Sequence, residues 1–262
     1  MNRIGIKDNE NGAKLVKQIH DLDYIQVEGI FTHMYAADES NTDSAYAQLR
    51  RFKKFLFLLK KQGIEPRIKH ISNSAAIIRN IGDTYDMVRA GIIMYGISPS
   101  DETGVGNMDI KPILSVKSMI TYVKYIEKGE TVSYGGVYKA DKRVRVATIP
   151  IGYGDGYPRS LSNKGYVLIN GKRAYILGRV CMDQMMVDVS CIHDADVGTE
   201  VTVIGRDGSE FISVESLAKL CDKFPYELVC DLSKRIPRIY TKGELVVGIK
   251  DYTRDMYRDF LY

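Results

Sequence analysis

Apolar residues in the first hundred positions alternate between strand-like and helical spacing. Residues 25–34 (IQVEGIFTHM) form an apolar run between polar segments, which predicts a buried strand. Residues 43–63 carry apolar side chains at helical spacing, so we predict a helix with Ser44 as its N-cap and Gly63 at its end. Two more strands and a short helix are predicted at 67–72, 86–96 and 74–80. This alternation predicts parallel strands joined by right-handed crossovers.

Helical periodicity largely disappears after the Gly- and Asp-rich segment 98–109. Short β-rich runs follow, punctuated by glycine, at 114–126, 143–151, 165–178, 185–190 and 198–205. Asn170-Gly171 lies between two strand-like runs, which is a strong hairpin signal. One amphipathic segment, 213–224, is predicted to cover part of the β structure as a helix.

The fold class predicted from these patterns is α/β plus all-β. We place the α/β part at residues 1–108, the β domain at 109–240 and a C-terminal extension at 241–262. The extension is expected to end in a peripheral helix or to be partly disordered. Three parallel strands alone would leave unprotected sheet edges. Either this small sheet packs on the β domain, or the chain is the back part of something larger.

The composition of the chain mainly argues against certain classes of protein and site. The 262 residues are 45% hydrophobic with a net charge of +4, which gives no case for nucleic-acid binding. No apolar run approaches the roughly 18 residues of a membrane span, and the N-terminus lacks the apolar core of a signal peptide. We therefore expect a cytoplasmic protein. The four cysteines and four histidines are scattered, so no metal site is expected.

Polar residues end each of the three predicted strands. In HISNSAA, Ser74 and its neighbour Asn73 either cap the following helix, which is the favoured interpretation, or present an anion site. Arg89 either faces a ligand, with Gly91 allowing close backbone approach, or pairs with a carboxylate such as Asp86. His33 alone is typical of a structural histidine. Its coincidence with Ser74 and Arg89 at one sheet edge favours a site.

Three segments of the β domain have unusual compositions. Tyr134 precedes two glycines in VSYGGVY, and Tyr153 lies in the loop GYGDGYPRS. Met182 and Asp183 lie between strand-like runs, where a carboxylate needs a partner or solvent. Taken separately, each segment is a weak signal: the first is also consistent with a hairpin turn beside a packing tyrosine, and the second with a tight loop.

Taken in order, the segments resemble the successive signature segments of the alanine racemase family. They are MNRIGI, EGIFTHMYAADE, HISNSAA, DMVRAGIIMYG, VSYGGVY, ATIPIGYGDGYPRSLSN, GRVCMDQMMVDV and LSKRIPRIY, and they span Met1 to about Tyr240. The resemblance implies a TIM-type (β/α) barrel followed by a β domain, a head-to-tail homodimer, pyridoxal 5′-phosphate (PLP) as cofactor and a small amino acid as substrate. It further implies an isomerase that makes D-alanine for peptidoglycan precursors.

The resemblance also implies roles for single residues. Ser74, with the backbone around Gly91 and Ile92, resembles the PLP phosphate site. Arg89 resembles the arginine that faces the pyridine nitrogen, and His33 its supporting neighbour.

Further roles concern the substrate. Arg3 resembles the arginine near the cofactor's phenolic oxygen and the substrate carboxylate. Tyr134 is similar to the catalytic tyrosine, which the family supplies from the partner subunit. Tyr153 resembles a substrate-entry tyrosine, and Met182 with Asp183 resembles the carboxylate-binding and entryway pair.

The family's PLP-holding lysine, which is also its second base, lies in a segment resembling VKANAYGHG that these 262 residues do not contain. We therefore expect a C-terminal two-thirds of an alanine racemase, inactive alone and complemented by a missing N-terminal half. Lys234 replaces a tyrosine of some relatives and either pairs with phosphate or is solvated. Alternatives are a serine or broad-specificity racemase and a non-catalytic PLP-binding or vestigial module.

Overall fold

The computed structural model describes residues 1–82 and 84–260, which form two compact units. The units are Met1–Ile113 and Leu114–Tyr262, so the second begins a few residues later than the boundary placed at 108/109 from the sequence. No helix in the described ranges is both long and apolar enough to cross a membrane.

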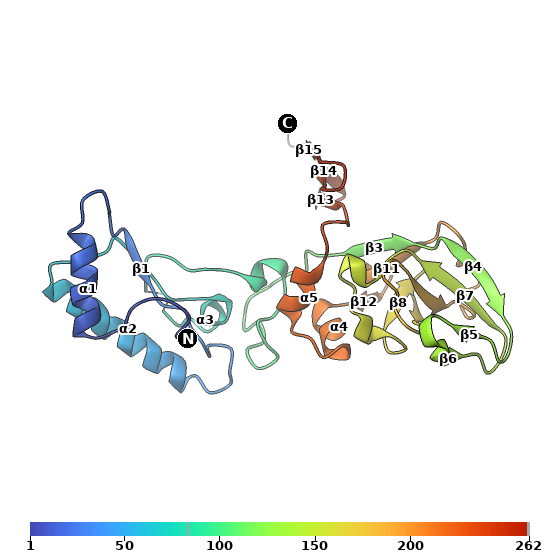
Figure 1. Ribbon diagram of the computed structural model, residues 1–262, viewed down its shortest axis with the longest axis horizontal. Coiled ribbons are helices and arrows are strands. Elements are labelled where there is room, and N and C mark those ends of the chain that lie inside the picture. The colour runs from blue at the N-terminus through green and yellow to red at the C-terminus, as the bar shows by residue number, and fades with distance from the viewer. Residues whose placement is uncertain (83, 261–262) are drawn as a thin grey trace. The chain divides into compact units, whose positions relative to one another are not determined.

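The N-terminal unit contains a small parallel sheet with helices packed beside it (Figure 1). Its elements are α1 (Glu10–His20), β1 (Gly29–Phe31), α2 (Asp43–Lys61), β2 (Ile68–His70), α3 (Ser74–Ile78) and the 3-10 helix η1 (Ile92–Tyr95). The predicted parallel pairing is confirmed for β1 and β2, where Gly29 pairs with Ile68 and Phe31 with His70.

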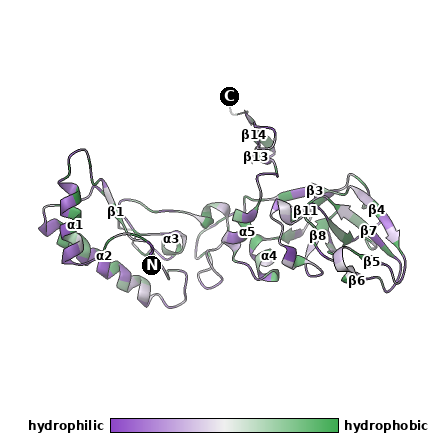
Figure 2. Ribbon diagram, in the orientation of Figure 1, coloured by the Kyte–Doolittle hydropathy of each residue, from purple (hydrophilic) through white to green (hydrophobic). Residues whose placement is uncertain are grey.

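The long helix α2 builds the core of this unit. Figure 2 shows hydrophilic and hydrophobic stretches along its ribbon, as expected for an amphipathic helix. Phe52 packs with Ile71 and Ala76 from the segment around α3. Phe55 and Leu59 pack in a second cluster with buried residues of α1. Burial of these side chains fixes α2 beside the sheet.

Two details of the predicted N-terminal unit are wrong. Ser44 is not the N-cap: α2 begins after Thr42, and the Ser44 hydroxyl is buried without a partner among the described residues. The predicted third strand is reduced to one parallel bridge between Met87 and His70. After this bridge the chain leads through Gly91, with φ −119° and ψ −105°, into η1.

The helix α1 was not anticipated from the sequence. Only Gly12, Ala13 and Val16 are buried on it, so its apolar face is narrow. Its start is nevertheless encoded locally, because the Asn9 side chain accepts a hydrogen bond of 3.0 Å from the Gly12 amide.

The C-terminal unit is rich in β structure, as predicted. Its strands are β3 (Val116–Met119), β4 (Tyr122–Ile126), β5 (Thr131–Val132), β6 (Tyr138–Lys139), β7 (Val144–Ile149), β8 (Tyr166–Ile169), β9 (Lys172–Tyr175), β10 (Met185–Asp188), β11 (Glu200–Asp207) and β12 (Glu210–Ile212). One sheet has the order β12-β11-β8-β9 with β3 also on β11, another has β10-β7-β4, and β5 pairs with β6.

Several elements of this unit were predicted correctly from short sequence signals. The Asn170-Gly171 hairpin joins β8 to β9, with both residues at positive φ (51° and 72°). The predicted helix within 213–224 is α4 (Val214–Leu220), which the Ser213 side chain caps. Three short helices that were not predicted also occur: α5 (Pro225–Asp231), η3 (Tyr153–Asp155) and η4 (Arg159–Leu161). A further 3-10 turn, η2 (Tyr134–Gly136), joins β5 to β6.

The expectation of a helix or disorder after residue 240 is wrong for the described residues. The segment forms an antiparallel sheet of β13 (Arg238–Lys242), β14 (Leu245–Asp251) and β15 (Met256–Asp259) (Figure 1). Gly243, at φ 62°, turns the chain between β13 and β14. The Val, Ile and Tyr residues of this segment favour strands over a helix. Residues 261 and 262 lie outside the described ranges.

Candidate functional site

Arg89 lies at the carboxyl ends of the two parallel strands β1 and β2. Its Nη2 donates to the carbonyl oxygens of Thr32 (3.1 Å) and Ile71 (3.3 Å) and to Nδ1 of His33 (3.2 Å). Its Nη1 donates to Nδ1 of His70. The guanidinium is therefore held by residues that follow both strands. The sequence-based juxtaposition of His33 and Arg89 is present.

The alternative in which Arg89 pairs with Asp86 is not observed. Asp86 instead accepts from the Lys69 amide (2.7 Å) and lies 3.8 Å from its Nζ. Among the described residues, Arg89 contacts no carboxylate and its Nε has no hydrogen-bond partner. One donor of a fixed, charged guanidinium thus remains available for a ligand.

The two histidines beside Arg89 are kept neutral. Burial, followed by repulsion from Arg89, lowers the pKa of both His33 and His70. Arg3 also lowers the pKa of His33, which places this exposed arginine within electrostatic reach of the same cluster. Neutral imidazoles can accept hydrogen bonds, and the arrangement of each ring is consistent with that role.

Ser74 lies beside Gly91, as the sequence-based site requires. The cap of α3 is Asn73, whose side chain accepts from the Ala76 amide at 3.1 Å, so that favoured interpretation is confirmed. Ser74 is therefore not needed as the cap. Its buried hydroxyl accepts from the Gly91 amide (3.0 Å), and its own proton has no acceptor among the described residues. Gly91 leads directly into Ile92, the first residue of η1.

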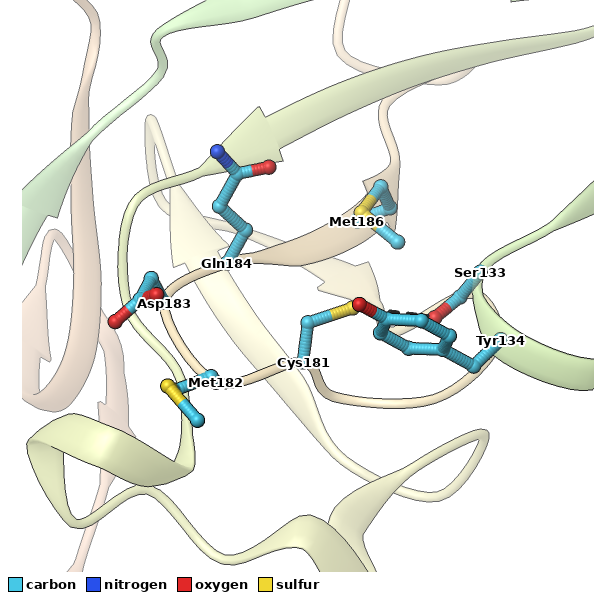
Figure 3. A pocket seen from close by; sticks show the side chains of 7 residues that line it. All are labelled: Ser133, Tyr134, Cys181, Met182, Asp183, Gln184 and Met186. Atoms are coloured by element: carbon cyan, nitrogen blue, oxygen red, sulfur yellow. Dashed lines mark hydrogen bonds between the residues drawn. The ribbon is translucent and has the colours of Figure 1, made fainter.

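The C-terminal unit contains a separate hollow of about 440 Å³. Figure 3 shows its lining residues, which come from the β5–β6 connection, the approach to β10 and β10 itself. They are Ser133, Tyr134, Cys181, Met182, Asp183, Gln184 and Met186. Three residues predicted from distant segments, Tyr134, Met182 and Asp183, therefore line one hollow.

The residue before Tyr134 has a strained backbone. Ser133 has φ 67° and ψ −178°, a region that is essentially restricted to glycine. Its hydroxyl donates to the Arg179 carbonyl oxygen at 2.6 Å and lies 3.3 Å from Cys181 Sγ. These contacts hold the turn in which the Tyr134 side chain is 69% exposed. Such an outlier motivates a functional hypothesis for the neighbouring tyrosine.

The loop that carries Tyr153 is bonded to the loop that carries Met182. The Tyr153 amide donates to the Cys181 carbonyl oxygen (3.0 Å), and the Gly154 amide donates to that of Met182 (2.8 Å). A Cβ on Gly152 would lie 2.2 Å from the Cys181 carbonyl oxygen, so the close approach requires glycine. The glycines of this loop therefore bring it against one wall of the hollow.

Asp183, for which either a partner or solvent was expected, pairs with Arg235. Its Nη2 donates to Asp183 Oδ1 at 2.7 Å, and its Nε lies 3.6 Å from Asp155 Oδ1. The other oxygen of Asp155 accepts from the Gly152 amide at 2.9 Å. Arg235 and Asp155 were missed from the sequence because 52 residues separate Arg235 from Asp183. The adjacent Lys234 instead lies 5.4 Å from the Tyr252 ring centre.

Two family models match this chain. "Alanine racemase, N-terminal domain" matches residues 1–99, and "Alanine racemase, C-terminal domain" matches residues 113–240.

The chain belongs to the alanine racemase family.

The alanine racemase of Halothermothrix orenii is 45% identical over 240 residues, which cover 92% of this chain and 63% of the relative. Alanine racemase 1 of Clostridium acetobutylicum is 40% identical, with 96% and 65% covered. The chain thus spans about 63–65% of the length of these curated relatives.

Solved alanine racemases share the fold. The Bacillus anthracis enzyme, solved with bound L-Ala-P, gives a TM-score of 0.92 at 38% identity, covering 98% of this chain and 66% of that one. The Bartonella henselae enzyme, solved with covalently bound pyridoxal phosphate, gives 0.77 at 28% identity, with 92% and 64% covered. These matches confirm the predicted class, a partial α/β barrel followed by a β-rich domain.

Proposed function

We propose that this chain takes part in the PLP-dependent interconversion of L- and D-alanine. The relatives that it resembles along most of its length are alanine racemases, and one solved relative holds covalent pyridoxal phosphate. The observation that carries the proposal is the environment of Arg89. Its terminal nitrogens are fixed by His33, His70 and carbonyl oxygens, while Nε remains without a partner among the described residues.

This donor set fits a pyridine nitrogen. Burial lowers the pKa of the Arg89 guanidinium, but the ordinary value lies so far above neutral pH that Arg89 stays charged. It can therefore donate a hydrogen bond through Nε without transferring its proton to the ring. Bound PLP would supply an electron sink for the pair of electrons left when the α-proton of alanine departs. Because Arg89 would not give its proton to the ring nitrogen, the ring would accept these electrons less strongly.

The neighbouring groups fit the remaining polar parts of the cofactor. The Ser74 hydroxyl can donate its proton to a ligand, since that proton has no acceptor among the described residues. The backbone of Gly91 and Ile92 follows beside it, and Gly91 has no side chain that would obstruct an anion. These groups would bind the phosphate. Arg3, within electrostatic reach of His33, would attract the phenolic oxygen and the substrate carboxylate.

The C-terminal unit would contribute the proton-transfer group and the entrance. Tyr134 presents an exposed hydroxyl on a turn held by Ser133, so it can act as acid or base on one face of the substrate carbon. Met182 and Asp183 share its hollow, and we assign them to carboxylate binding and entry together with Tyr153. As in the family resemblance, a partner copy of this chain would supply these residues in a homodimer.

The second base and the cofactor anchor require a lysine. None of the 262 residues lies in a segment resembling VKANAYGHG, so the proposed reaction needs that lysine from polypeptide outside them. We place the reaction in the cytoplasm, where D-alanine would supply peptidoglycan precursors.

The test measures racemisation of L-alanine and, in parallel, L-serine by the purified chain with PLP. Each reaction is run alone and with a co-expressed N-terminal half that carries the lysine. We expect alanine turnover only with the added half, and faster than serine turnover. Faster serine turnover would identify a serine racemase. A folded pair that binds PLP, by its absorbance, and racemises neither amino acid would contradict the proposal.

A further inference from the structure

A second hollow, of about 500 Å³, lies at the other end of the β7–β10 pair from the hollow that contains Tyr134. These two strands run antiparallel. The first hollow includes Met186, near the start of β10. The second includes Arg143 and Arg145, at the start of β7, and Ser190, just beyond the end of β10. The two hollows are therefore distinct, and none of the residues with a role in the proposed racemisation lines the second.

Arg145 is a half-buried cation that the fold holds in place. Its Nη1 donates to the carbonyl oxygens of Ile192 (3.2 Å) and His193 (3.1 Å), and its amide donates to Ser190 Oγ (3.0 Å). Its Nη2 and Nε have no partners among the described residues, and it pairs with no carboxylate there. The fold has therefore already restricted the rotation of the Arg145 side chain, so a ligand would not have to do so. Two nitrogens of its planar guanidinium, Nη2 and Nε, remain available to donate hydrogen bonds to a ligand.

Two further cations line the same hollow. The Arg143 guanidinium stacks 4.2 Å from the Tyr125 ring centre, and its Nε lies 3.1 Å from Glu127. Lys124 has no ion pair within the described ranges. The acidic lining residue is Asp196, whose Oδ1 already accepts from the Val197 amide at 2.8 Å.

The lining therefore offers an excess of positive charge and of hydrogen-bond donors. Ser190 adds a hydroxyl whose oxygen is used by the Arg145 amide and whose proton has no acceptor among the described residues. Guanidinium forks match the oxygen pairs of carboxylates and phosphates, while lysine adds a mobile point charge.

We propose that this hollow binds a small oxyanion with two negative charges, held by Arg145, Arg143, Lys124 and Ser190. Phosphate and small dicarboxylates both have this charge and both present pairs of oxygen atoms to a guanidinium group. The site is independent of PLP and of the lysine that the racemase reaction requires, so its test does not depend on that activity.

The experiment titrates inorganic phosphate into the full ¹⁵N-labelled chain at constant ionic strength, with sodium chloride as the balancing salt. Succinate is titrated in a parallel series. We expect saturable shifts of the Arg145, Ser190 and His193 amides with at least one of the two anions. Shifts at Ser74 and Gly91 would report on the proposed cofactor site separately.

The test variant is Lys124→Gln with Arg143→Gln, which leaves the contacts of Arg145 to its turn intact. Its dissociation constant should rise at least about tenfold, as expected for lost charge-assisted hydrogen bonds. A control variant, Lys164→Gln with Lys172→Gln, removes the same charge outside the lining and should bind as the parent does. Non-saturating shifts with both anions, or equal weakening in both variants, would overturn the proposal.

Discussion

The Ser133 hydroxyl donates a hydrogen bond of 2.6 Å to the Arg179 carbonyl oxygen while the Ser133 backbone occupies a region that is nearly exclusive to glycine. The bond therefore ties a strained turn to the segment that leads to Met182 and Asp183. Since Tyr134 follows Ser133 directly, the same bond holds two walls of the hollow together.

Two substitutions at Ser133 distinguish the effect of losing its hydrogen bond to Arg179 from the effect of its strained backbone. Ser133→Ala loses the hydrogen bond but keeps the strained Cβ, so it should lower the free energy of unfolding by about 1–2 kcal/mol. Ser133→Gly loses the same bond but adopts this backbone readily, so its loss should be smaller. Urea unfolding followed by near-ultraviolet circular dichroism measures both. A glycine variant less stable than the alanine variant would contradict this account.

Arg235 should control the mobility of the loop that carries Tyr153. In Arg235→Gln the contacts to Asp183 and Asp155 are lost, so the Tyr153 and Gly154 amides should exchange with solvent about tenfold faster. Arg235→Lys should restore part of the protection. The control is Arg173→Gln, which removes another exposed arginine–carboxylate pair, with Glu210. If both glutamine variants changed the exchange equally, Arg235 would have no special role in holding the loop.

Stability should depend on pH through the histidines around Arg89. Their pKa values are lowered in the folded protein, so between those values and about 6.5 the unfolded state binds more protons. This contribution is present above about pH 6.5 and is lost as pH falls towards the folded values. Imidazole ¹H–¹³C shifts should titrate with midpoints below 6.5 for His33 and His70. Midpoints at or above 6.5 would contradict the lowered pKa values of these two half-buried rings and the stability contribution drawn from them.

Gly96 should tolerate alanine poorly. It has φ 71°, and a Cβ there would lie 2.0 Å from the Lys111 carbonyl oxygen. Gly63, in the same unit, has φ 73° and open space around its Cβ position. We expect Gly63→Ala to cost about 1 kcal/mol from backbone strain and Gly96→Ala about 2–4 kcal/mol because overpacking is added. Equal losses in urea unfolding would show that the close approach to Lys111 is absent.

Local signals predicted the elements whose chemistry is contained in a few neighbouring residues. Asn170-Gly171 specified its hairpin through the φ values that these residues adopt readily. The predicted third parallel strand is only a single bridge at Met87, and the chain then leads through Gly91 into η1. An apolar run alone does not distinguish these outcomes.

In the candidate site, too, some residues could be predicted from the sequence and others could not. Ordered sequence segments identified His33, Ser74 and Arg89, and the structure places Ser74 beside Gly91 and His33 beside Arg89. His70 and Arg235 were missed because each acts through a partner remote in the sequence, Arg89 and Asp183 respectively. Nothing in the immediate sequence of either residue encodes such a contact.

In the proposed function, Tyr134 exchanges a proton with the α-carbon of alanine. The most direct test of this exchange follows deuterium incorporation at that carbon, from L- and D-alanine in D₂O, by the PLP-loaded chain together with the lysine-bearing half. Tyr134→Phe should reduce interconversion of the enantiomers at least about 100-fold, while the PLP absorbance stays unchanged. Interconversion by the phenylalanine variant at the parent rate would contradict the claim.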